Sequence, residues 1–402
     1  MARKMKDSGI EWIKSIPVNW ECKRGKQLFI ETNERSIAGT EELLTVSHIT
    51  GVTPRRQKNV NMFMSESLTG YKICHPGDIA ANTMWLWQGA VGVSNYHGVI
   101  SPSYNTYRQR TNDYDSKYLD YLLRIQPLID TYAAYSTGIT LSRLRLYPES
   151  FLSIYFIVPP LTEQQHISSY LDVHCSEIDA MLSKTRSSIE EYKKLKQAVI
   201  TQAVTKGVRG EREMKDSGNP WFGQIPTDWK LSRVGLHFSI ILGKMLCKAP
   251  LNDTYTLEPY YCAADVHFDG VADGERKKMW FSPIEKDLYR VSVGDLLVVE
   301  GGAGAGGSAI VENQDSYTYI QNSIMIVRSK GNADSRYLRY LLEFLVKQGY
   351  IDVVCNKATI PHFTKDKLSC VPFCLCPTGE QKEIADYLDA KCAEIDRLIA
   401  KK

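Results

Sequence analysis

Long apolar runs, dense cysteines and a strong charge of one sign are all missing from this 402-residue sequence. The longest apolar run, residues 151–160, is ten residues long, whereas a membrane span needs about 18 or more. Residues 1–9 are charged and lack the apolar stretch of a signal peptide. Ten cysteines are too few for a disulfide scaffold. We therefore expect a cytoplasmic protein with reduced thiols.

The charge balance is close to neutral, with 49 Lys and Arg against 46 Asp and Glu. Hydrophobic residues at 43% and charged residues at 24% are typical of globular domains, which excludes a disordered or acidic-tail protein. At about 150 residues per domain, the length favours two to three domains. A net charge of +3 supplies no strong overall field, so any binding to nucleic acid must depend on local basic patches.

The sequence contains an internal duplication. Residues 5–29 and 214–238 are identical at 11 of 25 positions, with an offset of 209. Residues 160–184 and 377–401 are identical at 12 of 25 positions, with an offset of 217. Since repeats mark repeated structural units, the chain consists of two tandem halves.

The interiors of the two halves are far less similar than their ends. They share little beyond Gly77-Asp78 with Gly294-Asp295, and residues 116–123 with 335–342. A duplication that keeps its ends while its interior diverges favours two modules with different ligands. Neutral drift of one interior gives the same pattern, and the sequence leaves both explanations open.

Residues 162–206 are predicted to form one long helix, with Thr162 as a suitable N-cap and Gly207 beyond its end. Forty-five residues would span about 67 Å. Steps of three and four define a heptad seam with polar interruptions, typical of a helix that packs on another long helix. The predicted packing residues of the first helix are Ile167, Leu171, Ile178, Met181, Tyr192 and Leu195; those of the second, at the 217-residue offset, are Ile384, Leu388, Ile395 and Leu398.

Two further expectations concern these helices. Lys402 corresponds to Thr185, so the second helix lacks counterparts of residues 186–206. The polar residues Glu163, Gln164, Glu177 and Asp179 are predicted to face outward, either solvated or in contact with a partner.

The interiors read as mixed sheet with a few helices. Strands are predicted to begin at residues 77–79 and 294–299, helices at 116–124 and 335–343, and each interior ends on an apolar strand, 151–160 and 368–377. The predicted fold class is α+β: two tandem mixed α/β modules separated by two long antiparallel coiled-coil helices, with a pseudo-two-fold internal repeat. The expected boundaries are 1–158 and 208–375 for the modules, and 159–207 and 376–402 for the helices.

Three sets of motifs recur in order along the chain. They are the tryptophan segments at 15–20 (SIPVNW) and 224–229 (QIPTDW), the segment at 159–164 (PPLTEQ) that leads into Tyr170-Leu171-Asp172, and residues 203–207 (AVTKG). In this order the sequence resembles the specificity subunit of a type I restriction-modification system, over nearly its whole length. The missing distal half of the second helix departs from the family pattern.

The resemblance implies two target-recognition domains that each read one part of a split DNA sequence, and two helices that act as a ruler between them. It also implies three kinds of partner: double-stranded DNA, two modification (adenine methyltransferase) subunits, and restriction subunits with motor and nuclease activity, with no membrane contact. Accordingly, we expect no cofactor on this chain, and S-adenosylmethionine, ATP and Mg on the partner subunits.

Sequence signatures of catalysis are scarce. There is no Asp-Pro-Pro-Tyr or Asn-Pro-Pro-Tyr run for adenine methylation, no phosphate-binding loop with Gly-Lys-Ser/Thr, and no His-Glu-x-x-His pair. Cys370, Cys374 and Cys376 lack the two Cys-x-x-Cys pairs of a zinc site and are predicted to be strand residues, so no metal is expected. We predict a chain without catalytic residues.

One glycine-rich stretch, residues 302–307, satisfies G-x-G-x-x-G. A dinucleotide site requires a helix directly after such a turn, but residues 308–311 look like another strand. Two interpretations stay open: a glycine-rich hairpin, or a loop that lets its backbone approach DNA closely.

Basic and polar side chains in the interior loops are the candidates for DNA contact, because arginine can read guanine, and asparagine or glutamine can read adenine. For each of them, simple solvation is the alternative, and the two tryptophans could equally be packing residues. In the first half the candidates are Arg55, Arg56, Lys58, Asn82, Trp85, Trp87, Gln88, Arg143 and Arg145. In the second half they are Lys277, Lys278, Gly302, Gly304, Asn356, Lys357 and His362.

Since the interiors differ, an asymmetric, bipartite DNA target is predicted rather than a palindrome. Two other classes of function stay open. A non-catalytic scaffold would bind the methyltransferase subunits without sequence preference on DNA, and a nucleotide-dependent enzyme would use the glycine loop.

Overall fold

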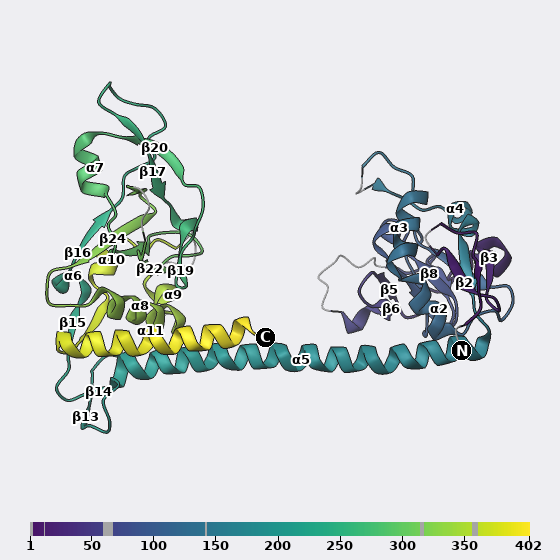
Figure 1. Cartoon of the computed structure of the whole chain (residues 1–402), viewed down its shortest axis with the longest axis horizontal. Coiled ribbons are helices and arrows are strands. Elements are labelled where there is room, and N and C mark those ends of the chain that lie inside the picture. The colour runs from purple at the N-terminus through teal and green to yellow at the C-terminus, as the bar shows by residue number, and fades with distance from the viewer. Residues whose placement is uncertain (1–2, 12, 59–66, 141–142, 314–316, 356–360) are drawn as a thin grey trace. The chain divides into compact units, whose positions relative to one another are not determined.

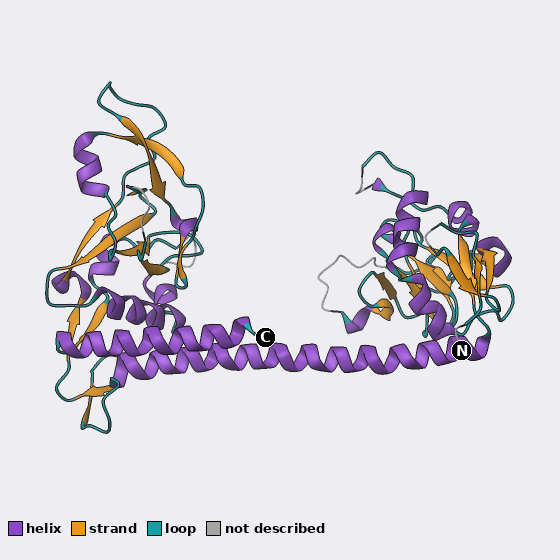
Figure 2. Ribbon diagram, viewed as in Figure 1, coloured by secondary structure: helices purple, strands orange, loops and turns teal. Residues whose placement is uncertain are grey.

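The computed structural model of the chain describes residues 3–11, 13–58, 67–140, 143–313, 317–355 and 361–402 (Figure 1). It divides into two compact units, Met1–Met181 and Leu182–Lys402, and the division falls within helix α5 (Leu161–Lys206). Each unit contains a module of mixed strands and helices (Figure 2). No helix in the described ranges is long and apolar enough to cross a membrane.

The first module precedes α5. Its strands are β1 (Met5–Asp7), β2 (Ser15–Pro17), β3 (Glu21–Arg24), β4 (Phe29–Thr32), β5 (Leu44–Ser47), β6 (Gly51–Pro54), β7 (Lys72–Cys74), β8 (Ile79–Ala81), β9 (Val91–Val93), β10 (Gly98–Ile100), β11 (Asn105–Gln109) and β12 (Tyr155–Val158). Its helices are α1 (Gly25–Leu28), η1 (Arg55–Gln57), η2 (Leu86–Gln88), α2 (Ser116–Leu123), α3 (Gln126–Tyr135) and α4 (Pro148–Ser153).

The second module lies between α5 and α11 (Thr378–Ala400). Its strands are β13 (Met214–Asp216), β14 (Gln224–Pro226), β15 (Lys230–Arg233), β16 (Phe238–Leu242), β17 (Thr256–Tyr261), β18 (Val266–His267), β19 (Gly270–Val271), β20 (Lys277–Phe281), β21 (Leu296–Val299), β22 (Ser308–Ile310), β23 (Tyr319–Ile320), β24 (Ile324–Ser329) and β25 (Pro372–Leu375). Its helices are α6 (Val234–His237), α7 (Pro283–Tyr289), η4 (Ala263–Asp265), α8 (Ser335–Lys347), α9 (Tyr350–Val354) and α10 (Lys365–Ser369).

Both modules are built on the same four-stranded antiparallel sheet. The strand order is β4-β11-β8-β9 in the first module and β16-β24-β21-β22 in the second. In both, an amphipathic helix, α2 or α8, follows the last strand of this sheet and buries its apolar side in the module core. The duplication therefore extends through interiors whose sequences had diverged, and the α+β class and internal repeat are confirmed.

A buried aspartate explains why Gly-Asp is among the few interior motifs that both halves retain. Asp78 and Asp295 each accept a hydrogen bond from the backbone N–H three residues earlier, at 3.0 and 2.8 Å, which closes the turn before the central strand. Each also pairs with an arginine of the adjacent strand, Arg108 at 2.7 Å and Arg328 at 2.6 Å. The carboxylates are almost fully buried, so the arginine offsets the cost of their desolvation.

The predicted long helix is confirmed, since α5 is continuous over 46 residues. In the second unit its C-terminal end packs antiparallel to α11. Lys196 contacts Asp396 at 2.7 Å and Arg209 contacts Glu383 at 2.8 Å, so residue numbers rise along one segment as they fall along the other. Ile384, Leu388 and Ile395 of α11 are buried there.

The predicted seam on α5 itself is wrong at several positions. Leu195 is 49% exposed, and the buried apolar residues of α5 in the second unit are instead Ile200, Ala203 and Val204. The seam assumed strict heptads, whereas a short contact between two nearly straight helices follows the 3.6-residue period. Tyr192 is half-buried and Leu398 is 37% exposed near the end of α11.

In the first unit the predicted packing also differs. Ile178 and Met181 are 55% and 69% exposed, so neither packs on a second helix there. Ile167 and Leu171 are half-buried, and Ile167 contacts the core of its own module. The predicted strand at 151–160 is correct only for β12, because residues 148–153 form α4.

The Gly-Asp turn yields a stability prediction. Replacing Asp295 by Ala removes the acceptor of two arginine hydrogen bonds and one backbone bond, so we expect a loss of about 1.5–3 kcal/mol. Hydrogen exchange of β21 and β24 measures the local effect, with exposed Asp179→Ala as the control. Unchanged protection of both strands in the Asp295 variant would contradict this role.

Candidate nucleic-acid interface

In the first module, the predicted basic cluster lies on η1, directly after β6. Arg56 is well exposed and its Nε contacts Glu42 Oε1 at 2.5 Å. Lys58 is half-buried, and desolvation lowers the pKa of its ammonium group. Arg55 is half-buried at the start of the same turn. The cluster therefore presents Arg56 most openly to an anionic partner.

The second predicted cluster surrounds η2. Trp85 and Trp87 stack with ring centroids 6.2 Å apart, and Trp85 is 48% exposed while Trp87 donates its indole N–H to the Met84 carbonyl at 3.1 Å. Asn82 is buried and donates to the Tyr104 hydroxyl at 2.9 Å, while its side-chain oxygen accepts the Met84 N–H. Asn82 therefore shapes this loop, and its contact with bases stays a prediction.

Tyr104 lies beside the tryptophan loop, where its hydroxyl accepts the hydrogen bond from Asn82. Burial raises the pKa of this hydroxyl, and the positive charge of Arg55 partly opposes that rise. Sequence reasoning missed Tyr104, which carries no motif.

Arg143 and Arg145 follow α3, whose residues pack on η2. Arg145 forms an antiparallel bridge with Thr137 and donates to the Leu144 carbonyl at 2.9 Å. Arg143 is exposed.

In the second module, the glycine-rich stretch is a hairpin between β21 and β22, and no helix follows it. Gly302 has φ of +89°, a conformation that side chains other than glycine rarely adopt. A Cβ on Gly304 would meet nothing closer than 3.9 Å, so space does not demand glycine there. The hairpin interpretation is confirmed, and the nucleotide-binding alternative loses the helix that it requires.

The structure brings His362 to this hairpin. His362 pairs with Gly301 through a backbone bridge, and its Nδ1 lies 3.3 Å from Glu300. Lys277 and Lys278 are exposed on β20, which pairs with β17. The predicted residues Asn356 and Lys357 lie outside the described residues.

Each module is fastened to its helix by a set of polar contacts that we name a joint. The first joint consists of Arg3, Trp20, Asp115, Lys117, Tyr121, Glu163, Gln164 and Asp172. The second joint consists of the residues at the equivalent positions: Arg212, Trp229, Asp334, Arg336, Tyr340, Glu380, Gln381 and Asp389.

The glutamine of each joint is fully buried. Gln164 accepts the Asp115 N–H at 2.9 Å and donates to the Pro159 carbonyl at 2.8 Å. Gln381 accepts the Asp334 N–H and donates to Cys376 with the same distances. Because each aspartate is the N-cap of α2 or α8, the glutamine ties the start of that helix to the start of α5 or α11.

The tryptophan and glutamate form a second contact in each joint. Trp20 donates to Glu163 at 2.9 Å, and Trp229 donates to Glu380 at 3.3 Å. Hydrogen bonds from Arg3 and then Trp20 lower the pKa of Glu163 despite its partial desolvation. The expectation that Glu163 and Gln164 face outward is therefore wrong.

A third contact lies about two turns further along each helix. Asp172 accepts from Lys117 at 2.7 Å and from Tyr121 at 2.9 Å. Asp389 accepts from Arg336 at 2.7 Å and from Tyr340 at 2.8 Å. The retained Tyr-Leu-Asp motif is thus explained by its aspartate, which fixes the side of the helix that faces the module.

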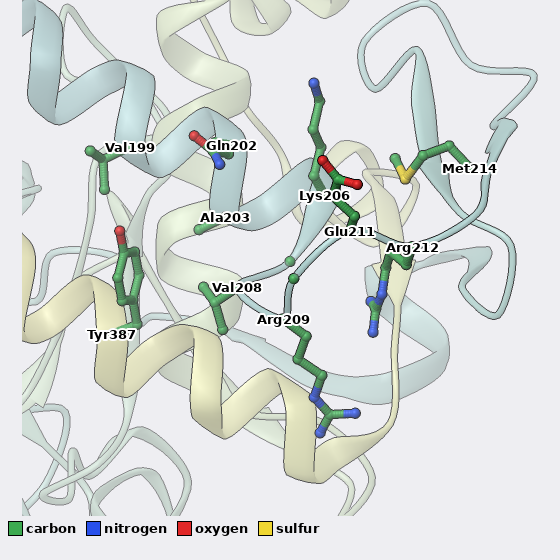
Figure 3. Close-up of a pocket in the computed structure, with 12 residues that line it drawn as sticks. Val199, Gln202, Ala203, Lys206, Val208, Arg209, Glu211, Arg212, Met214 and Tyr387 are labelled. Atoms are coloured by element: carbon green, nitrogen blue, oxygen red, sulfur yellow. The ribbon is translucent and has the colours of Figure 1, made fainter.

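The end of α5 and the segment that follows it, drawn in Figure 3, lie beside the second joint. Gly207 has φ of +77°, and a Cβ there would lie 3.0 Å from Glu380 and 3.3 Å from Trp229. Beside it lies a cavity of about 600 Å³ lined by residues of α5, the connecting segment 207–214 and Tyr387. Arg212 contacts Glu380 at 2.6 Å across this connection.

The cysteines form no recognisable site. Cys374 and Cys376 are buried in and beside β25, and burial raises the pKa of the Cys376 thiol to about 12. Within the described ranges, no group of three or more His, Cys, Asp or Glu residues is arranged to hold a metal ion.

Known proteins share parts of this sequence and its fold. Residues 226–402 match the family model of the type I restriction modification DNA specificity domain. The whole chain is similar to a solved chain from a study of complex assembly and conformational transition of the type I R-M system, with a TM-score of 0.71, 17% identity, and coverage of 96% of this chain and 93% of that one. The HsdS subunit from Thermoanaerobacter tengcongensis gives a TM-score of 0.55 at 16% identity, covering 95% and 91%.

Two curated relatives come from Methanocaldococcus jannaschii. The MjaX type I restriction enzyme specificity subunit is 28% identical over 250 residues, 60% of this chain and 52% of that protein. The MjaVIII specificity subunit is 26% identical over 162 residues, 40% and 36%. The chain thus spans about half or less of the length of these relatives.

The family match places residues 226–402 in the class of type I restriction modification DNA specificity domains. Over a larger part of its length, the chain is similar to type I restriction enzyme specificity subunits in sequence, and it shares the fold of the HsdS subunit.

The joints yield a prediction. Gln164→Ala leaves the Asp115 N–H and the Asp113 and Pro159 carbonyls without their partner, so we expect the first module to loosen by about 1–3 kcal/mol. Hydrogen exchange at the start of α2 and α5 reports this change, and exposed Gln165→Ala is the matched control. Equal exchange in the two variants would show that the buried amide does not fasten the module.

Proposed function

We propose that this chain recognises an asymmetric, bipartite sequence in double-stranded DNA, with each module reading one part. The observation that supports this best is that the two modules share their sheet and their joints but differ in their candidate contact surfaces. The two modules share one sheet and equivalent joints, yet their candidate contact residues lie on different elements. The connection β8–β9 contains η2, whereas the equivalent connection β21–β22 is the glycine hairpin, and the remaining candidates include residues on η1 in one module and β20 in the other. Two modules that are fastened in the same way but carry different contact surfaces are suited to reading different bases.

The chemistry of these surfaces fits DNA. In the first module, Arg56 and Arg55 supply positive charge for phosphates or for guanine, Gln88 is suited to adenine, and exposed Trp85 offers an apolar plane. In the second module, Lys277 and Lys278 supply charge, and the Gly302 turn lets the backbone approach a strand closely.

We propose further that the chain contributes specificity and no catalysis. Two modification subunits would methylate adenine with S-adenosylmethionine, and restriction subunits would cleave DNA with ATP and Mg, all bound by those partners. The complex would act in the cytoplasm, where its DNA substrate is. A scaffold without sequence preference remains the alternative, and the experiments below distinguish the two.

The basic turn yields a prediction on DNA affinity. Replacing Arg55 and Arg56 by Ala weakens DNA binding and reduces the slope of log K against log salt by up to about two units, because each phosphate contact releases counterions. The measurement is a salt titration of the assembled complex with duplex DNA. Replacing Lys184 and Arg186, exposed on α5, removes the same charge elsewhere and serves as the control. Equal slopes for the two double variants would remove the η1 turn from the interface.

The experiment that tests recognition of an asymmetric DNA sequence most directly is a map of adenine methylation. The chain is co-expressed with a cognate modification subunit, and methylated adenines are mapped across the host genome by long-read sequencing. We expect one split motif with two different halves. Identical halves would refute the asymmetry, and an assembled complex with methylation at no defined motif would favour the scaffold.

A further inference from the structure

The glycine hairpin between β21 and β22 contains one glycine that the fold does not require. Gly302 and Gly306 have φ of +89° and +82°, which favours glycine at both positions. On Gly307, a Cβ would lie 2.9 Å from the carbonyl oxygen of Gly304. Gly304 itself has no positive φ, and a Cβ there would meet Val299 at 3.9 Å and nothing closer. Neither conformation nor packing therefore accounts for Gly304, and the space beside it is open.

Gly304 lines a cavity of about 920 Å³ within the second unit. The walls come from α5, α8, α11, the glycine hairpin and the turn between β18 and β19, and Figure 1 shows α8, β19 and β22 near α11. Ligand pockets have volumes of about 300–1,000 Å³, so the cavity has room for a small molecule. Much of its lining is apolar, from Val266, Phe268, Ala303, Ala305, Val346 and Ile399.

The lysines and the acidic residues of the cavity are equal in number. The lysines are Lys193, Lys196 and Lys347, and the acidic residues are Asp269, Glu343 and Asp396. One of each already forms an ion pair, since Lys196 Nζ lies 2.7 Å from Asp396 Oδ2. Because the opposite charges balance, the cavity favours a neutral ligand over a phosphate or an ammonium compound.

Two polar atoms of the cavity lining are buried and unpaired. Gln197 Nε2 and Glu343 Oε2 have no hydrogen-bond partner among the residues that the structure describes. Glu343 is 6% exposed, and its Oε2 lies 3.1 Å from Arg339 in an ion pair without hydrogen-bond geometry. Buried polar groups are nearly always paired. A molecule that pairs both atoms must offer an acceptor to the Gln197 N–H and a donor to the Glu343 carboxylate.

The first module carries different groups at the equivalent positions. At an offset of 219, Arg339 and Glu343 correspond to Asp120 and Arg124, so the ion pair is retained with its charges exchanged. Asp120 accepts a hydrogen bond from the Val93 N–H at 2.9 Å. The connection that corresponds to the glycine hairpin contains η2. The carboxylate and the open hairpin are therefore features of the second module and not of the architecture that both modules share.

We propose that this cavity binds a neutral, largely apolar small molecule that carries an amide or lactam group. The carbonyl oxygen of the ligand accepts a hydrogen bond from Gln197 Nε2, and its N–H donates to Glu343 Oε2. The apolar part packs against Phe268 and Val346, in the space that Gly304 leaves open. The site is independent of DNA recognition and goes beyond the function proposed above.

The test is a titration of the full chain with benzamide, which joins a neutral amide to an apolar ring, followed by saturation-transfer NMR. We expect saturable binding at one site. Benzoate has the same shape, but it lacks the N–H donor and carries a charge that Glu343 repels. It should bind at least about tenfold more weakly, which corresponds to about 1.4 kcal/mol. Equal affinities for benzamide and benzoate would overturn the proposal.

Three variants locate the bound benzamide. Gly304→Leu fills the open space and should abolish binding, whereas Gly379→Leu adds the same side chain at an exposed glycine outside the cavity and should leave binding unchanged. Gln197→Leu removes the donor at nearly constant size and should weaken binding about tenfold.

Circular dichroism melting checks that each variant is folded, and Gln197→Leu decides the outcome if Gly304→Leu is not. The proposal fails if benzamide does not bind the unaltered chain, or if the folded cavity variants bind it as well as Gly379→Leu does. Since no DNA is present in these titrations, their failure leaves the proposed function untouched.

Discussion

The orientation of each module depends on one buried side chain, the glutamine at the start of the supporting helix. Gln164 and Gln381 each accept a hydrogen bond from a backbone N–H at the N-cap of α2 or α8. Each also donates one to a carbonyl just after the last strand of its module, so these buried backbone groups are paired without water. An unpaired backbone group in such a place costs free energy comparable to a lost hydrogen bond, so only one arrangement of module and helix satisfies all of these groups. The tryptophan-glutamate and aspartate-tyrosine contacts stabilise the same arrangement of module and helix.

This arrangement separates two demands on the sequence. Contacts that hold a module in place involve the ends of the interior, the Gly-Asp turn and the first turns of α2 and α8, and these are the positions that the two halves share. The loops at η1, η2 and the glycine hairpin contribute little to the joints. They can change without altering how the module is held, which is the condition under which recognition surfaces diverge while a scaffold persists.

The sequence predicted those parts of the fold that depend on local patterns or on the duplication. The 46-residue helix follows from its lack of breakers, and α2 and α8 follow from their amphipathic periodicity and aspartate caps. The seam on α5 was wrong because a heptad pattern does not reveal which side of a helix is covered, or over what length; Leu195 and Ile200 are both apolar, and only tertiary contact buries the second. The hydrogen bond of Asn82 to Tyr104 was not predicted, because Tyr104 is distant in sequence and carries no motif. Glu163 and Gln164 were placed outside because polar residues usually are, yet their presence in both repeats was the available signal that they bond internally.

The unequal burial of the two joints has an energetic consequence that follows from solvent access alone. Glu380 lies in a fully buried setting and is paired with Arg212 and Trp229, so each of its bonds is made without competition from water. Glu163 makes the equivalent contacts with Arg3 and Trp20 where solvent still reaches the carboxylate, and exposed ion pairs contribute little because water screens them. The equivalent contacts are therefore open to water in the first module and shielded from it in the second, where the apolar end of α5 excludes solvent. Shielding strengthens each polar contact but also raises the desolvation cost of the carboxylate, so Glu380 depends more strictly than Glu163 on keeping all of its partners.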